Sequence, residues 1–385
     1  MRLAPLLTAL TAAVVGCGGS VAIVLSAAEA ARATPAQTAS WFTALCLVMA
    51  ATSAFLSLRH RMPILTAWST PGAALIAASA GAGLTIETAV GAFVVAASLI
   101  LLTSLVGPLA RLIERLPVPI ASAMLAGVLL KLVSAPFELV GEPRAALLVI
   151  PMLAAFLVWR LLQPTLAVIG VLLLGVVIAV LLGQVSTLPP TAFASLETIV
   201  PRFEPAIALG LGVPLYLVTM ASQNLAGFAV LRASGYEHVP ARSILGVTGV
   251  ASLVSAFAGA HTSNLAAISA AICTGRDTDP DPARRWPAGV WYGLAYLAFA
   301  AVGPMLVALF AVLPPALLKT AAGIALAMPM IGALSQAFSG DHDKLAPGLT
   351  FAITVSGVAI AGVGAAFWGL VVGLAAHGLK QRLAR

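Results

Sequence analysis

The chain alternates between long apolar runs and short polar stretches, and the pattern inside each run indicates its structure. The runs are continuous and rich in Ala, Leu, Val and Gly. Alternation with a period of two would be typical of membrane-barrel strands, whereas about 20 consecutive apolar residues are typical of a spanning helix. Because a segment in lipid must satisfy its own backbone hydrogen bonds, the pattern predicts an all-α polytopic membrane protein.

Most of the runs are long enough to be spanning helices. They are predicted at residues 4–28, 38–58, 86–112, 117–137, 144–161, 165–183, 206–232, 243–258, 286–312, 314–336, 345–361 and 363–380. Two further pieces, residues 63–83 and 259–274, each start with irregular sequence and continue as only a short helix-like run. Together they predict about 14 segments, seven in each half. The first run could instead be a signal peptide, but the repeat described next needs it as a helix.

The two short pieces resemble each other. Residues 68–78 read WSTPGAALIAA and residues 261–271 read HTSNLAAISAA, which is an offset of 193. A second pair, LPVPIASAMLAGVLL at 116–130 and LPPALLKTAAGIAL at 313–326, has an offset of 196 to 197. The two pairs predict a duplication, and an odd number of segments per half requires the halves to insert with opposite topology. Inverted repeats with interrupted helices are typical of secondary transporters.

Composition and charge agree with a protein embedded in the lipid bilayer. Of the 385 residues, 61% are hydrophobic and only 9% are charged, against about a quarter charged in soluble domains. With both termini on one side, fifteen of the 20 Lys and Arg residues fall on that side. Because positively charged loops favour the cytoplasm, both termini are predicted to be cytoplasmic. The net charge of +7 therefore indicates no nucleic-acid partner.

The two short pieces place helix N-termini inside the membrane. Such an end exposes unpaired backbone N–H groups and the positive end of the helix dipole, which together favour an anion. Residues suited to the N-cap position stand at both starts: Ser69 and Thr70 in the first piece, and Thr262, Ser263 and Asn264 in the second. The sequence therefore predicts that these residues bind an anion near the middle of the bilayer.

A third polar cluster and two titratable residues complete the candidate site. Gln223 and Asn224 are adjacent amides in an apolar helix. They are predicted to bind the anion, and their alternative role is to join helices or to satisfy an interrupted backbone. His261 titrates near neutral pH and is a candidate to couple a proton to the substrate, although it could also be a substrate ligand or a structural residue. Glu87 is the second proton-coupling candidate, because charges near the membrane interior are often functional.

Enzyme chemistry has no support in the sequence. Cys17, Cys46 and Cys273 lie in apolar runs, and the five His residues are scattered. These residues form no metal-binding spacing and no nucleophile with a base, so neither a metal nor another cofactor is predicted. The chain also lacks the G-x-x-x-x-G-K-[ST] loop that would indicate a nucleotide site.

Several motifs resemble those of the benzoate/proton symporter family, the BenE type. They are TMASQNLAG followed by VLRASGY, then NLAAISAAICTG with DPDPARRW, then GAAFWGLVVG. AWSTPGAAL and PVPIASAMLAGVLL fit the same family, so the resemblance runs from about residue 63 to residue 373. It implies proton symport of benzoate or a similar small aromatic carboxylate by alternating access, in a bacterial-type inner membrane. It also implies kinship with nucleobase and anion permeases that contain a seven-plus-seven inverted repeat, and a possible homodimer.

This kinship implies how the segments are arranged. Segments 3 and 10 would each be a short strand followed by a half-helix, and the substrate would lie between them, beside segments 1 and 8. The expected spans are 1–185 and 206–385 for the two repeats, about 1–115 with 206–312 for a core domain, and about 116–185 with 313–385 for a gate domain.

One departure from the nucleobase relatives bears on the substrate. Those relatives carry carboxylates in segments 8 and 10, where this chain has Gln223, Asn224 and His261. The absence of these carboxylates suits an anionic substrate, which they would repel. It also removes the obvious proton carrier. A further alternative is that benzoic acid binds with its own proton. A nucleobase or inorganic-anion carrier of the same fold remains the alternative function, followed by an anion channel.

Overall fold

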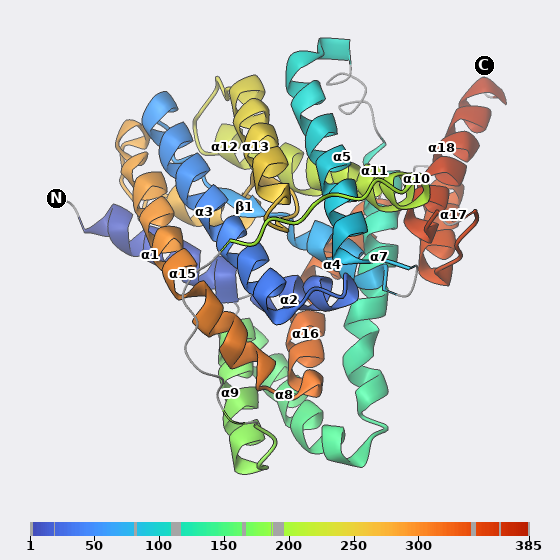
Figure 1. The fold of residues 1–385 in the computed structure, drawn as a ribbon. Coiled ribbons are helices and arrows are strands. Elements are labelled where there is room, and N and C mark those ends of the chain that lie inside the picture. The colour runs from blue at the N-terminus through green and yellow to red at the C-terminus, as the bar shows by residue number, and fades with distance from the viewer. Residues whose placement is uncertain are drawn as a thin grey trace.

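The computed structural model describes residues 3–18, 20–80, 83–108, 117–163, 167–185, 187, 196–339, 344–361 and 363–383. It is mostly helical, with two three-residue strands near its centre (Figure 1). Within these residues, eight helical stretches are long and apolar enough to cross a membrane. The predicted class, a helical polytopic membrane protein, is confirmed. Residues 109–112, the predicted end of segment 4, lie outside the described residues.

The elements follow the predicted segments closely. The first half contains α1 (Ala4–Gly18), α2 (Val21–Ala30), α3 (Pro35–His60), β1 (Thr66–Trp68), α4 (Thr70–Ala78), α5 (Ile86–Leu105), α7 (Val118–Leu139), α8 (Pro143–Leu162) and α9 (Ala167–Leu181). The second half contains α10 (Pro205–Ile207), η1 (Ala208–Gly212), α11 (Val213–Val218), η2 (Thr219–Asn224), α12 (Leu225–Ala233), α13 (Ala241–Ala256), β2 (Ser263–Leu265), α14 (Ala267–Cys273), η3 (Pro282–Arg284), α15 (Pro287–Ala311), α16 (Pro315–Phe338), α17 (Leu345–Ser356) and α18 (Ala365–Leu383).

Local sequence explains why several helices begin where they do. Thr34 accepts a hydrogen bond from the backbone N–H of Gln37, whose side chain accepts one from the backbone N–H of Thr34. Thr85 and Thr88 form the same reciprocal pair at the start of α5. This capping box satisfies N–H groups that a helix leaves unpaired at its start. Proline at the first position of α3, α8, α15 and α16 costs no helical hydrogen bond.

Segments 1 and 8 are both irregular, which a single helix over residues 4–28 did not predict. The first segment is broken between α1 and α2, where the Ser20 hydroxyl donates to the carbonyl of Gly16 at 2.6 Å. The eighth contains two π-helical turns, η1 and η2. The second turn coincides with the TMASQN motif, and π turns within α-helices are frequent at functional sites.

The two strands pair antiparallel, which fixes the register of the internal repeat. Thr66 pairs with Leu265, and Ala67 pairs with Asn264. β1 and β2 start 197 residues apart, at 66 and 263, as do α4 and α14, at 70 and 267, and α7 and α16, at 118 and 315. The offset of 193 predicted for the short pieces is therefore wrong by four residues. Small apolar residues match one another in several registers, so the sequence match fell one helical turn away from the structural equivalence.

The helices pack as two groups that meet around the half-helices. In the first group α15 packs along α3, α13 along α5, and α1 against both α14 and α15. In the second, α16 and α17 pack against α7, α8 packs against α9, and α18 packs against α17. Contacts of α4 with α7, and of α2 with α16, join the groups. Figure 1 shows α8, α9 and α16 in the lower part of the view, below the centre that holds β1 and α4.

Candidate substrate site

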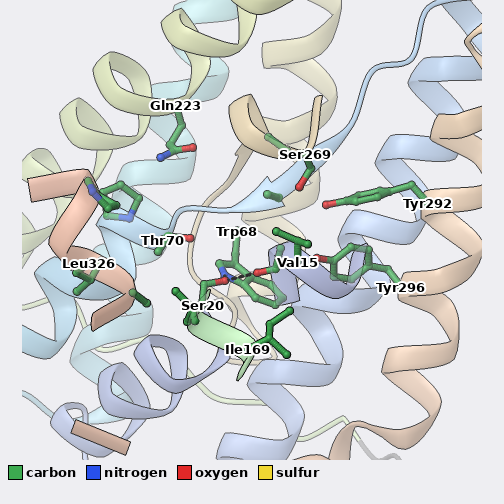
Figure 2. Close-up of a pocket in the computed structure, with 17 residues that line it drawn as sticks. Val15, Ser20, Trp68, Thr70, Ile169, Gln223, Ser269, Tyr292, Tyr296 and Leu326 are labelled. Carbon is green, nitrogen blue, oxygen red and sulfur yellow. Dashed lines mark hydrogen bonds between the residues drawn. The ribbon is translucent and has the colours of Figure 1, made fainter. Parts of the chain in front are cut away.

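A cavity of about 230 Å³ lies where the two helix groups meet. Both half-helices, the interrupted segments 1 and 8, and α15 contribute to its wall, while α9 and α16 close it from the second group. None of the described residues lining it carries a charged side chain. Its polar lining residues are Ser20, Thr70, Gln223, Ser269, Tyr292 and Tyr296 (Figure 2).

Two of the predicted site residues line this cavity, and six lie behind it. Thr70 is the first residue of α4, and Gln223 lies in η2. Figure 2 shows both on the same side of the cavity. The six that lie behind the cavity wall are Ser69, Asn224, His261, Thr262, Ser263 and Asn264, and all six are buried.

A chain of buried hydroxyls fixes the start of α4. The Ser69 hydroxyl accepts a hydrogen bond from the backbone N–H of Gly72 at 3.1 Å, which makes Ser69 the N-cap as predicted. The Thr219 hydroxyl donates to the same Ser69 oxygen at 3.0 Å and lies 2.9 Å from the Thr262 hydroxyl oxygen. These contacts join η2 and Thr262, the residue before β2, to the N-cap of α4, so the hydroxyls position the half-helix and do not face the cavity.

Asn224 and the β2 residues form a second buried network. The side-chain oxygen of Asn224 accepts from the backbone N–H of Leu265 at 3.0 Å, and the amide of Asn264 donates to the carbonyl of Leu265 at 2.7 Å. The backbone N–H of Ser263 donates to the hydroxyl of Ser252 at 2.8 Å. For Asn224 this geometry favours the alternative role of satisfying an interrupted backbone.

The start of α14 differs from the prediction. Its N-cap is Ala266, and no side chain caps it within the described residues, so the expectation that Thr262, Ser263 or Asn264 would cap this helix is wrong. The strand continues through Leu265, and the backbone N–H of Ala266 still bonds the carbonyl of Leu65. The helix therefore begins later, and its first N–H groups lack a side-chain acceptor.

His261 is engaged at both ring nitrogens. Its Nδ1 accepts a hydrogen bond from the indole N–H of Trp41 at 3.0 Å, and its Nε2 lies 3.1 Å from the carbonyl oxygen of Ser69. The indole N–H can only donate and the carbonyl can only accept, so the ring is neutral with its proton on Nε2. A second proton, on Nδ1, would place an imidazole N–H opposite the indole N–H of Trp41, and two donors cannot bond each other. The arrangement favours the structural role among the three that the sequence leaves open.

The other proton-coupling candidate lies away from the cavity. Glu87 is exposed in the first turn of α5, and it contacts the chain through its backbone carbonyl, which accepts from the backbone N–H of Arg202 at 2.9 Å. It is not among the residues that line the cavity.

Sequence reasoning named Trp68 as a candidate for contact with an aromatic ring, but it missed the two tyrosines that complete the aromatic wall of the site. The indole N–H of Trp68 donates to the Ser20 hydroxyl at 2.9 Å, and the Trp68 ring meets the Tyr296 ring edge-on with centroids 6.0 Å apart. The rings of Tyr292 and Tyr296 have centroids 4.7 Å apart. These tyrosines are four residues apart in WYGLAY, so they share one helix face. That spacing was the available signal.

Comparisons with known proteins agree along the whole chain. Residues 1–379 match the family described as BenE: Benzoate membrane transport protein. The chain is 39% identical over 376 residues to the inner membrane protein YdcO of Escherichia coli, covering 96% of this chain and 93% of that protein. It is 33% identical over 367 residues to the benzoate membrane transport protein of Acinetobacter baylyi, covering 95% of this chain and 92% of that protein.

Two solved structures share the fold. The transmembrane domain of the cyanobacterium bicarbonate transporter BicA has a TM-score of 0.61 at 14% identity, covering 97% of this chain and 98% of that domain. SLC26A9 has a TM-score of 0.62 at 14% identity, covering 98% of this chain and 66% of that protein. At this identity the likeness shows the fold alone, and it confirms the inverted-repeat class.

Proposed function

The chain belongs to the benzoate membrane transport protein family, and on that premise we propose that it imports benzoate or a similar aromatic carboxylate together with a proton. The family consists of membrane transport proteins, so the chain is a transporter and not an enzyme. We place it in a bacterial inner membrane with both termini in the cytoplasm. The observation that carries the substrate proposal is the uncharged, aromatic-walled cavity at the two half-helices.

The cavity suits both parts of a small aromatic acid, its ring and its carboxylate. Its volume of about 230 Å³ is below the range of about 300–1,000 Å³ for drug-sized pockets. Trp68 and the two tyrosines provide apolar surface for a ring. Thr70 and Gln223 offer hydrogen-bond donors for a carboxylate without adding charge. The N-terminus of α4, which begins at Thr70, adds the positive end of a helix dipole on the same side.

The packing of the helices supports alternating access between a core and a gate. We assign both half-helices to the first group, because α4 packs against α2, and α14 packs against α1, which in turn packs against α15. Ile169 of α9 and Leu326 of α16 reach the cavity from the other group. We propose that these groups are the core and the gate. Movement of one against the other then exposes the cavity to one side of the membrane at a time.

The proton is proposed to travel with the substrate. The described residues lining the cavity include no titratable acid or base apart from tyrosine, and both nitrogens of His261 are occupied by structural partners. Burying an unpaired carboxylate is costly, whereas the neutral acid is cheaper to enclose. The half-helices hold the carboxylate while the cavity is open to water, and protonation neutralises it for the crossing.

Purified protein in proteoliposomes, with an imposed pH gradient and a panel of labelled aromatic acids, tests this function. We expect benzoate to accumulate when the outside is acidic, and the accumulation to collapse when a protonophore removes the gradient. If unlabelled uracil or sulfate reduced the uptake of labelled benzoate more strongly than unlabelled benzoate does, the result would instead support a nucleobase or inorganic-anion carrier. Benzoate flux without stoichiometric proton flux would indicate a channel and contradict the proposal.

A further inference from the structure

The cavity has a second polar region, formed by three hydroxyl groups that converge on Gly16. A Cβ atom at Gly16 would lie 3.1 Å from the hydroxyl oxygen of Ser269, 3.2 Å from that of Tyr296 and 3.9 Å from that of Tyr292. The missing side chain therefore leaves room in which these groups from α14 and α15 come together. We call Ser269, Tyr292 and Tyr296 the hydroxyl cluster.

The members of the hydroxyl cluster lie beside one another. Tyr292 is fully buried, and its hydroxyl is close to the hydroxyls of Tyr296 and Ser269 without a well-aligned hydrogen bond to any described residue. The Ser269 hydroxyl also makes a long contact of 3.4 Å with the carbonyl of Ala12. Because buried polar atoms in native proteins almost always have well-formed hydrogen bonds, these poorly aligned hydroxyls are suited to a polar group that enters with the ligand.

The hydroxyl cluster and the carboxylate-binding residues lie at opposite sides of the cavity. Figure 2 shows Tyr292 and Tyr296 across from Thr70 and Gln223. Apolar residues such as Ile169 lie between them along the wall. A ligand that satisfies both sides has two polar ends separated by an apolar body.

We propose that the preferred substrates are aromatic carboxylates with a hydroxyl group on the ring, placed meta or para to the carboxylate. The ring hydroxyl bonds the hydroxyl of Tyr292, while the carboxylate faces Thr70 and Gln223. A hydroxyl can donate and accept, as the hydroxyl cluster can, whereas a second charged group would be buried without a counter-charge. This inference rests on the proposed function, because it assumes that the cavity carries an aromatic acid.

The position of the ring hydroxyl provides an internal control. In ortho-hydroxybenzoate the hydroxyl lies next to the carboxylate and bonds it, so it cannot reach the far side of the cavity. The meta and para isomers have the same atoms and the same net charge. A preference for these isomers over the ortho isomer therefore reports geometry rather than size or general polarity.

The test measures inhibition of labelled benzoate uptake in proteoliposomes by benzoate and by the three hydroxybenzoate isomers. We expect the meta or the para isomer to inhibit about tenfold more strongly than benzoate and than the ortho isomer, which corresponds to about 1.4 kcal/mol. Tyr292→Phe removes one oxygen and should reduce this ratio toward one. Tyr216→Phe is the matched control, because the Tyr216 hydroxyl is bonded to Thr103 at 2.6 Å and does not line the cavity.

The outcomes separate this inference from the function on which it rests. Equal inhibition by benzoate and all three isomers of the wild-type protein overturns the inference, and this comparison needs no variant to fold. An unchanged isomer ratio in Tyr292→Phe also overturns it, because Tyr292 would then bond the carboxylate or a water. Absence of uptake for every aromatic acid would instead show that the proposed function is wrong.

Discussion

The two half-helices occupy equivalent places in the repeat, yet they differ at the residues that meet the cavity. The N-cap of α4 is Ser69, whose hydroxyl caps the helix, while the equivalent residue of α14 is Ala266, which has no hydroxyl to do so. Three residues further along, α4 has Gly72, where a Cβ would lie 2.5 Å from a side-chain carbon of Leu215. α14 has Ser269 there, and Ser269 lines the cavity. Equivalent half-helices therefore present different residues to the cavity: Thr70 and Pro71 of α4, and Ser269 of α14.

The far ends of the half-helices differ as well. The last turn of α4 is completed by Ser79, whose backbone N–H bonds carbonyls of its own helix. At the end of α14 the buried guanidinium of Arg285 donates to the carbonyl of Thr274 at 2.6 Å. It also donates to the carbonyls of Asp279 and Pro280. A cation is favourable at a helix C-terminus, so the helix that lacks an N-cap is anchored from its other end.

The largest expected effect comes from removing that anchor. Arg285→Met leaves three carbonyls without their donor, and losing buried hydrogen bonds to a charged group should cost about 3 kcal/mol or more. We expect a strong loss of folded protein, measured by fluorescence-detected size exclusion and by thermal melting in detergent. Arg284→Met is the matched control, because Arg284 is exposed and pairs with the exposed Asp281. Equal melting of the two variants would show that the anchor does not stabilise α14.

The next effect comes from making the half-helices alike. Gly72→Ser gives α4 the residue of α14, and its Cβ would meet both Leu215 and the Ser69 hydroxyl oxygen, the latter at 2.7 Å. Overpacking of this kind costs about 1–3 kcal/mol, so we expect a lower melting temperature. The reverse change, Ser269→Gly, removes atoms from the cavity wall and should melt closer to the wild type. A wild-type melting temperature for Gly72→Ser would contradict the closed packing of α4.

The sequence predicted the positions of the helices and of the two short pieces better than it predicted where the second half-helix begins. Continuous apolar runs located the helices, because lipid forces each segment to satisfy its own backbone. The short pieces at residues 63–83 and 259–274 became β1 with α4 and β2 with α14. The start of α14 was misplaced because Thr262 to Asn264 have the right side chains for capping. Pairing with β1 instead keeps them extended, and that tertiary contact has no local signal.

The candidate site was predictable only in part for a similar reason. Polar residues in apolar sequence are conspicuous, so the sequence pointed to Thr70 and Gln223. It pointed equally to buried polar residues that hold the structure together and do not line the cavity. The polar groups of Asn224 and His261 point to backbone and indole partners that lie far away in the sequence. Tyr292 and Tyr296 reach the cavity because α15 packs against α1. Their spacing of four residues places them on one helix face, but it does not show that this face meets a cavity.

A moderate effect is expected from adding the missing cap to α14. Ala266→Ser places a hydroxyl at the N-cap, where it can accept from the first N–H groups of the helix. If those groups help to hold the carboxylate, the hydroxyl competes with the substrate, and we expect KM for benzoate uptake to rise about tenfold. The melting temperature should stay the same or rise. An unchanged KM would mean that the start of α14 does not contact the substrate.

The smallest effect is expected at His261, which joins the segment before β2 to Ser69 at the start of α4 and to Trp41 of α3. The equivalent residue of the first repeat is the buried Ile64, so the imidazole exists in one repeat only, and it reaches across to the carbonyl of Ser69. His261→Gln replaces the neutral ring with an amide that can also accept from Trp41 and donate to Ser69. We expect a stability loss of about 1 kcal/mol and uptake that still increases as the outside becomes more acidic.

The measurement is benzoate accumulation in proteoliposomes across a series of imposed pH gradients. A variant that folds and binds benzoate but no longer responds to the gradient would make His261 the proton carrier. In that case the asymmetry between the repeats would concern coupling rather than structure.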